Sequence, residues 1–157
     1  MSNWRTAATE IVDSYSRISN RLADWPAGMD FCAHALAKAV RERDELPSWA
    51  FVTLGIEACH HLRSIDQWDQ DSFIDLLCGK QADYGHENIN AFGLVGVAIR
   101  IHDKMARLHN LTKAIRDPRN ETTLDTWRDI VGYSVIAQML YNNTFDLPLR
   151  EDYYTNV

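Results

Sequence analysis

One segment near the end of the chain, residues 121–141, is apolar on nearly every side when it is drawn as a helix. Its apolar residues leave no continuous polar stripe: Leu124, Trp127, Ile130, Val131, Val135, Ile136, Met139 and Leu140. A helix on the surface of a protein needs a polar face toward water, so a helix of this kind lies at the centre of its fold. The segment therefore predicts a central helix that other elements surround.

The rest of the chain has apolar residues at the spacing of amphipathic helices. Only seven glycines and four prolines occur in its 157 residues, which favours a compact, mostly helical protein. We therefore expect one all-α domain over residues 1–157, a bundle of five to six helices. The predicted helices are 5–23, 29–44, 49–63, 71–80, 90–112 and 121–141. The run AFVTLGI in the third of these would also suit a strand.

Several local signals add detail to this prediction. The sequence Trp25-Pro26-Ala27-Gly28 predicts a break between the first two helices, and DYGHEN predicts a turn around Gly85. Helical spacing places Phe31 and Trp49 on the faces that we expect to be buried. Residues 143–157 are aromatic and acidic, and we expect them to form a tail that runs over the surface.

Composition and charge exclude several classes of function. The net charge of −6 argues against general binding of duplex nucleic acid, which requires a basic surface. Cys32, Cys59 and Cys78 are far apart with no CxxC, which argues against a disulfide framework or a zinc site. No apolar run reaches the roughly 20 residues of a membrane span, and the first residues lack the apolar core of a signal peptide. We expect a cytoplasmic protein with no membrane partner.

The predicted central helix also carries an aligned set of acids. Glu121, Asp125 and Asp129 recur every four residues, which places them on one face of a helix. This face continues into apolar residues after Gly132, so we expect it to point inward. Buried carboxylates are costly unless they are paired or bind a metal ion. Two kinds of partner could neutralise these carboxylates. One is Mg²⁺, which prefers oxygen ligands, and the other is the basic stripe of the preceding helix, Arg100, Lys104 and Arg107.

Three motifs in the second half of the chain resemble a known family. They are the Asp83-Tyr84-Gly85 turn, then Arg100, Asp103, Lys104, Arg107 and Leu108, then Glu121, Asp125, Thr126, Asp129 and Tyr133. Over residues 77–140 this pattern resembles the nucleotide-modification-associated domain of the DUF1599 type, which is frequent in phages. That family is similar in turn to the all-α NTP pyrophosphatases of the MazG and dimeric dUTPase kind. Those proteins commonly carry ExxE and ExxD acid pairs, whereas the acids of this chain are four residues apart.

The resemblance implies a nucleotide site and a homo-oligomeric, phage-type protein of the host cytoplasm. It implies Mg²⁺, or Mn²⁺, bound by four acids of which the last three are catalytic: Asp103, Glu121, Asp125 and Asp129. The phosphates of a nucleotide or dNTP would be bound by Arg100, Lys104 and Arg107. The base would be contacted by Asp83, Tyr84, His86 and Asn88.

Three functions are consistent with these patterns. The first is a Mg²⁺-dependent pyrophosphohydrolase of (d)NTPs. The second is a non-catalytic module that binds a nucleotide or a signalling nucleotide, in which the acids form salt bridges with the basic stripe. The third is a structural helical bundle that interacts with other proteins. Turnover separates the first two functions, and the third predicts that nucleotides have no effect on the protein.

Overall fold

The computed structural model describes residues 2–18, 21–113 and 122–149, and every regular element in these ranges is a helix. The seven helices are α1 (Trp4–Arg17), α2 (Trp25–Glu42), α3 (Ser48–Ser64), α4 (Gln70–Tyr84), α5 (Glu87–Asn90), α6 (Gly93–Lys113) and α7 (Thr123–Tyr141). The predicted all-α single-domain bundle is confirmed, and the AFVTLGI run is helical. The described part has one helix more than expected because DYGHEN leads into the short α5.

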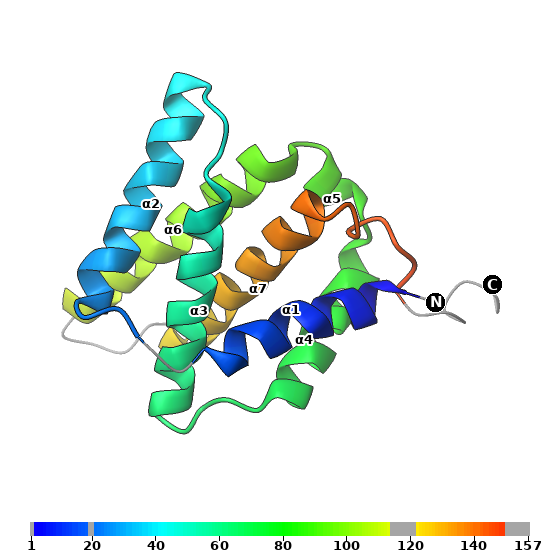
Figure 1. Cartoon of the computed structure of the whole chain (residues 1–157), viewed down its shortest axis with the longest axis horizontal. Helices are drawn as coiled ribbons and strands as arrows, with labels where there is room; N and C mark the ends of the chain where they lie inside the picture. Colours follow the sequence, from blue (N-terminus) through cyan, green and yellow to red (C-terminus); the bar gives the residue numbers. More distant parts are fainter. Residues whose placement is uncertain (1, 19–20, 114–121, 150–157) are drawn as a thin grey trace.

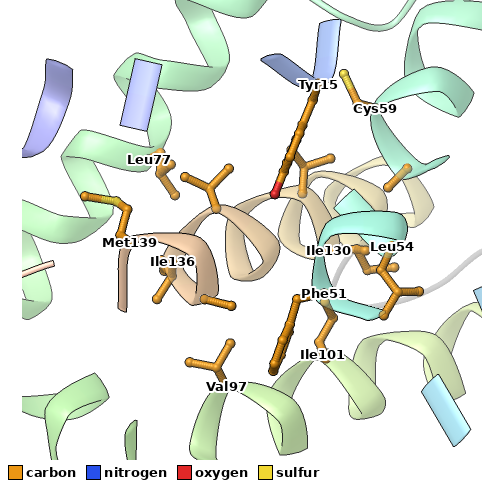
Figure 2. Packing of buried hydrophobic residues seen from close by; sticks show 14 of the residues in the cluster. Tyr15, Phe51, Leu54, Cys59, Leu77, Val97, Ile101, Ile130, Ile136 and Met139 are labelled. Atoms are coloured by element: carbon orange, nitrogen blue, oxygen red, sulfur yellow. The ribbon is translucent and has the colours of Figure 1, made fainter. Parts of the chain in front are cut away.

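Helix α7 lies at the centre of the bundle, as its apolar surface predicted (Figure 1). It packs against α3, α6 and α1. Figure 2 shows side chains of other helices closing around it, among them Tyr15 of α1, Phe51 of α3, Leu77 of α4 and Val97 of α6. Burying one large apolar side chain contributes about 1.5–3 kcal/mol, so the many contacts of α7 fix where its polar face can point.

Helices α3 and α7 cross at a point where their backbones approach closely. Gly55 faces Ser134 there, and a Cβ added at Gly55 would lie 2.7 Å from Cε2 of Tyr15. The hydroxyl of Ser134 donates to the carbonyl of Phe51 at 2.6 Å, and the hydroxyl of Tyr15 hydrogen-bonds to Ser134 at 2.7 Å. Both buried hydroxyls are thus satisfied inside the core, as buried polar groups require.

Two helix boundaries differ from the prediction. Trp25-Pro26-Ala27-Gly28 forms the first turn of α2 instead of a break, because Asp24 caps the helix and a proline in the first turn needs no N–H partner. Helix α4 continues past residue 80 to Tyr84 and ends at Gly85, whose φ of 69° favours glycine. Tyr84 therefore lies on the last turn of a helix and not in a loop.

Two aromatic residues that were predicted in the core are exposed. Phe31 is 65 % exposed and Trp49 is 49 % exposed, and their rings stack on each other with centroids 5.9 Å apart. The reason lies in the orientation of α2, which buries Met29, Cys32 and Leu36 at helical spacing and leaves Phe31 on the next face around the helix. Within the described ranges no helix is both long enough and apolar enough to cross a membrane.

The segment after α7 differs from the predicted surface tail. Phe145 and Leu149 are buried, and the ring of Phe145 meets that of Trp4 edge to face at 6.3 Å. The carbonyls of Pro148 and Leu149 accept hydrogen bonds from the first two backbone N–H groups of α1, at 2.7 and 3.1 Å. The start of α1 is therefore held by the segment that follows α7 (Figure 1). Residues 150–157 of the predicted tail lie outside the described residues.

Candidate functional site

A pocket of about 500 Å³ opens between α4, α6 and α7, beside the start of α1. Its charged lining consists of four cations and two acids, namely Lys80, Arg100, Lys104, Arg128, Asp83 and Asp129. Tyr84 and Asn88 line it as well, and its apolar wall includes Phe73, Leu77 and Ile136. The pocket brings together six residues that the sequence predicted for a nucleotide site: Asp83, Tyr84, Asn88, Arg100, Lys104 and Asp129.

Helix geometry explains why these side chains converge. Arg100 and Lys104 are four residues apart on α6, so both face the pocket. Lys80 and Tyr84 have the same spacing on the last turns of α4. Asp129 follows the first turn of α7 and faces the pocket between these two helices. Three separate helices thus contribute one charged cluster.

Asp129 is the centre of this cluster. Its Oδ1 accepts from Nζ of Lys80 and its Oδ2 accepts from Nζ of Lys104, both at 2.9 Å, and its side chain is only 19 % exposed. Burial by itself would raise the pKa of Asp129, but the hydrogen bonds and positive charges of Lys80 and Lys104 outweigh burial and hold its pKa below the ordinary value. Asp129 is therefore ionised at neutral pH.

Two of the other predicted metal ligands, Asp103 and Asp125, do not line the pocket with Asp129. The side chain of Asp125 is 51 % exposed and lies 3.5 Å from the guanidinium of Arg128, and Asp103 is exposed on α6. Glu121 lies outside the described residues. Among those that are described, no group of three or more acid, histidine or cysteine side chains is placed to hold a metal ion. A divalent cation at Asp129 would share its carboxylate with the ammonium groups of Lys80 and Lys104.

Two more predicted residues lie outside the pocket lining. Arg107 is half-buried and its Nε donates to Oγ1 of Thr126 at 3.2 Å, so this predicted phosphate ligand braces α6 against α7. His86 hydrogen-bonds to the side-chain amide of Gln81 at 2.8 Å and meets Phe145 edge to face. His86 therefore supports the end of α4 and is not among the residues that line the pocket.

Unpaired polar atoms add a second feature to the pocket wall. Trp4 lines the pocket and is fully buried, yet its indole N–H has no hydrogen-bond partner among the described residues. The side-chain oxygen of Asn88, which also lines the pocket, is buried and has no partner in this part of the chain either. Buried polar groups are almost always paired, so these two atoms are exceptions among the residues of the pocket wall.

Sequence reasoning missed Lys80, Arg128 and Trp4. Lys80 lies four residues before Tyr84, and this spacing would have revealed it if the predicted helix had continued past residue 80. Arg128 directly precedes Asp129 and borders the acid face of α7. Trp4 reaches the pocket only through the packing of α1, and no local pattern in the sequence indicates that.

Comparison of the chain with protein-family models, curated proteins and solved structures finds no match. The resemblance of residues 77–140 to the nucleotide-modification-associated family therefore stays a prediction, and the function has to be argued from the pocket.

Proposed function

We propose that this protein binds a nucleotide in the pocket between α4, α6 and α7, with its phosphates on Lys80, Arg100, Lys104 and Arg128. The observation that carries the proposal is the charge of this lining. Four cations exceed two acids in one pocket, on a chain whose net charge is −6. Such a local excess attracts anions, and charge-assisted hydrogen bonds from guanidinium and ammonium groups bind phosphate oxygens strongly.

The size and walls of the pocket support a nucleotide over a bare anion. A volume of about 500 Å³ falls within the range of about 300–1,000 Å³ that is usual for small-molecule sites. The apolar wall of Phe73, Leu77 and Ile136 suits the carbon atoms of an organic ligand. A polynucleotide duplex would not enter a pocket of this size.

Asp129 has a clear role in a binding site of this kind. Its carboxylate holds the ammonium groups of Lys80 and Lys104 in place before the ligand arrives, which lowers the entropy lost on binding. Helix α7 thus supplies the acid that pre-organises two phosphate-binding lysines of α4 and α6. This arrangement corresponds to the salt-bridge alternative for the acid face of α7.

Hydrolysis by a bound metal ion is the second candidate function. The support for it is that Asp129 is held as an ionised carboxylate beside the cations that would bind the phosphates. Mg²⁺ or Mn²⁺ would polarise the phosphates and activate water. The pyrophosphohydrolase activity implied by the family resemblance requires this metal, and binding alone does not.

The experiment is calorimetric titration of the full chain with each (d)NTP, with and without Mg²⁺ or Mn²⁺, followed by assay for released pyrophosphate. We expect binding without metal, and expect Lys104→Gln to weaken it about tenfold or more, because a hydrogen bond to a charged group contributes about 1.5–3 kcal/mol. Lys38→Gln is the matched control, since Lys38 is exposed on α2 and does not line this pocket.

Three outcomes separate the candidates. Binding that depends on Lys104 without turnover supports a binding module. Turnover that requires metal and is lost in Asp125→Ala supports the hydrolase. If no nucleotide binds, or if Lys38→Gln weakens binding as much as Lys104→Gln does, the pocket is not a nucleotide site and the proposal fails.

A further inference from the structure

A second hollow of about 370 Å³ adjoins the nucleotide pocket. The two share Phe73, Leu76 and Arg128 in their walls, so they are neighbours along α4. The second hollow lies against the end of α3 and the start of α4, and the residues it adds are Asp66, Gln67, Trp68, Asp69 and Ser72. None of these residues belongs to the motifs that predicted a nucleotide site.

The two hollows differ in charge. Apart from the shared Arg128, the first pocket has three cations and two acids, Lys80, Arg100, Lys104, Asp83 and Asp129, whereas the second hollow has only the acids Asp66 and Asp69. An anionic group therefore favours the first pocket, and a group that donates hydrogen bonds favours the second. A ligand that spans both has a single favourable orientation.

The second hollow also offers an aromatic surface. Trp68 packs against Phe73 with ring centroids 4.9 Å apart, and Phe73 lines both hollows. Trp68 is only half-buried, which leaves part of its ring accessible. Stacking on an aromatic side chain suits every nucleobase, because each base has a π-face. By contrast Tyr84, the predicted stacking residue, is 67 % exposed on the last turn of α4, so less of the protein holds its ring in place.

We propose that the nucleotide base lies in this second hollow, beside Trp68, and that an exocyclic amino group of the base donates to Asp66. The inference rests on the proposed function and names the class of nucleotide. Oδ1 of Asp69 already accepts from the backbone N–H of Ser72 at 2.9 Å, so Asp66 is the acceptor assigned to the base. Adenine, cytosine and guanine carry such an amino group, whereas uracil and thymine do not.

The test compares ligands with and without a base on the full chain. Wild-type protein is titrated with pyrophosphate, ATP, CTP, GTP, UTP and dTTP, and the titrations are repeated with Trp68→Leu, Asp66→Gly and Tyr84→Leu. Trp49→Leu is the matched tryptophan control, since Trp49 is exposed on α3 and lines neither hollow. Glycine suits position 66 because the φ of Asp66 is 57°.

We expect ATP, CTP and GTP to bind about tenfold more tightly than UTP or dTTP, since one hydrogen bond to a charged acceptor has about this effect. Trp68→Leu should weaken ATP binding about tenfold, within the usual effect of removing one stacked aromatic side chain. Asp66→Gly should abolish the preference for bases with an amino group. Pyrophosphate should bind Trp68→Leu, Asp66→Gly and Trp49→Leu within about twofold of wild type, because its site lies in the first pocket and none of these three residues lines that pocket. This binding also shows that each of these variants is folded.

The inference is overturned if Trp68→Leu binds ATP as wild type does while Tyr84→Leu does not, or if UTP binds as tightly as ATP. In both cases pyrophosphate still binds, so the anion site survives and only the position of the base is wrong. Absence of both pyrophosphate and nucleotide binding contradicts the proposed function itself. If Trp68→Leu does not fold, the base preference of Asp66→Gly decides the question alone.

Discussion

Asp129 shows how one carboxylate connects stability with function. Both of its oxygens accept from lysines, and its pKa is lowered below the ordinary value of 3.8. A group with a lowered pKa in the folded state stabilises the fold above its unfolded pKa and loses this contribution as the pH falls through the folded pKa. The contribution of Asp129 is therefore complete at neutral pH, begins to fall below about pH 4, where an unfolded aspartate takes up its proton, and is lost as the pH falls through the lower pKa of the folded state.

Asp129→Asn should lower the free energy of unfolding by about 1 kcal/mol at pH 7, a modest value because Lys80 is half-exposed and screened by solvent. The difference from wild type should shrink as the pH falls below about 4. Urea denaturation of both proteins from neutral pH down to about pH 2.5 measures it. A difference that stays constant over this range would show that the carboxylate charge is not what stabilises the fold.

The same substitution separates the two roles that the sequence left open for the acid face of α7. When Asp129→Asn replaces the carboxylate by a neutral amide, Lys80 and Lys104 lose their shared counter-charge. If Asp129 pre-organises the lysines, Asp129→Asn should bind pyrophosphate without metal more weakly than wild type, because Lys80 and Lys104 lose the group that holds them in place. If Asp129 is a metal ligand, the variant should lose metal-dependent turnover, and added Mg²⁺ should no longer strengthen nucleotide binding.

At the scale of elements, the contact between α3 and α7 depends on a glycine. A Cβ at Gly55 would overlap Oγ of Ser134 and lie 2.6 Å from its Cβ and 2.7 Å from Cε2 of Tyr15. These neighbours cannot move freely, because the hydroxyls of Ser134 and Tyr15 are tied to each other and to the carbonyl of Phe51. Separating α3 from α7 would disturb the helix that carries Asp129 into the pocket.

Gly55→Ala should therefore destabilise the protein by about 2–3 kcal/mol, the upper part of the usual range for overpacking a core. Gly79→Ala is the matched control, since a Cβ there meets nothing within 4 Å on the exposed side of α4. The control should gain up to about 1 kcal/mol from the higher helix propensity of alanine. Thermal and urea unfolding of both variants measures the contrast, and equal effects would contradict the close approach of α3 and α7.

The helical spacing of apolar residues predicted most of these helices. It failed where the same residue type suits two different structural positions. The central position of α7 followed from its apolar surface because no other location accommodates such a helix. Pro26 was interpreted as a break, but a proline also suits the first turn of a helix, and the capping by Asp24 decides between these cases. Phe31 and Trp49 were placed in the core because hydrophobic residues were assumed to be buried, although folded proteins expose many of them.

At the scale of the whole molecule, the candidate site depends on contacts between distant parts of the chain. Spacing within one helix predicted that Arg100 and Lys104 share a face, and it predicted the acid face of α7. Spacing could not predict that Lys80 of α4 meets Asp129, or that Trp4 at the start of α1 reaches the same pocket, because these contacts arise from packing. The second hollow beside Trp68 depends in the same way on how the end of α3 meets α4.

The two ends of the described chain meet at this pocket. Trp4 lines it, and Trp4 is held from behind by Phe145, which is 2 % exposed in the segment after α7. Phe145 also contacts the ring of His86, next to the end of α4 that carries Asp83 and Tyr84. One buried ring thus supports two walls of the pocket, so a change at Phe145 should affect stability and ligand binding together.

Phe145→Ala should lower the free energy of unfolding by roughly 3 kcal/mol, the usual cost of removing a buried phenylalanine ring. It should also weaken nucleotide binding several-fold under conditions where the variant is still folded, because Trp4 loses the ring that positions it. Phe92→Ala is the matched control, since Phe92 is 73 % exposed and contributes to neither hollow. Urea denaturation and calorimetric titration measure the two effects. Lost stability with unchanged nucleotide affinity would show that the start of α1 supports the fold without shaping the site.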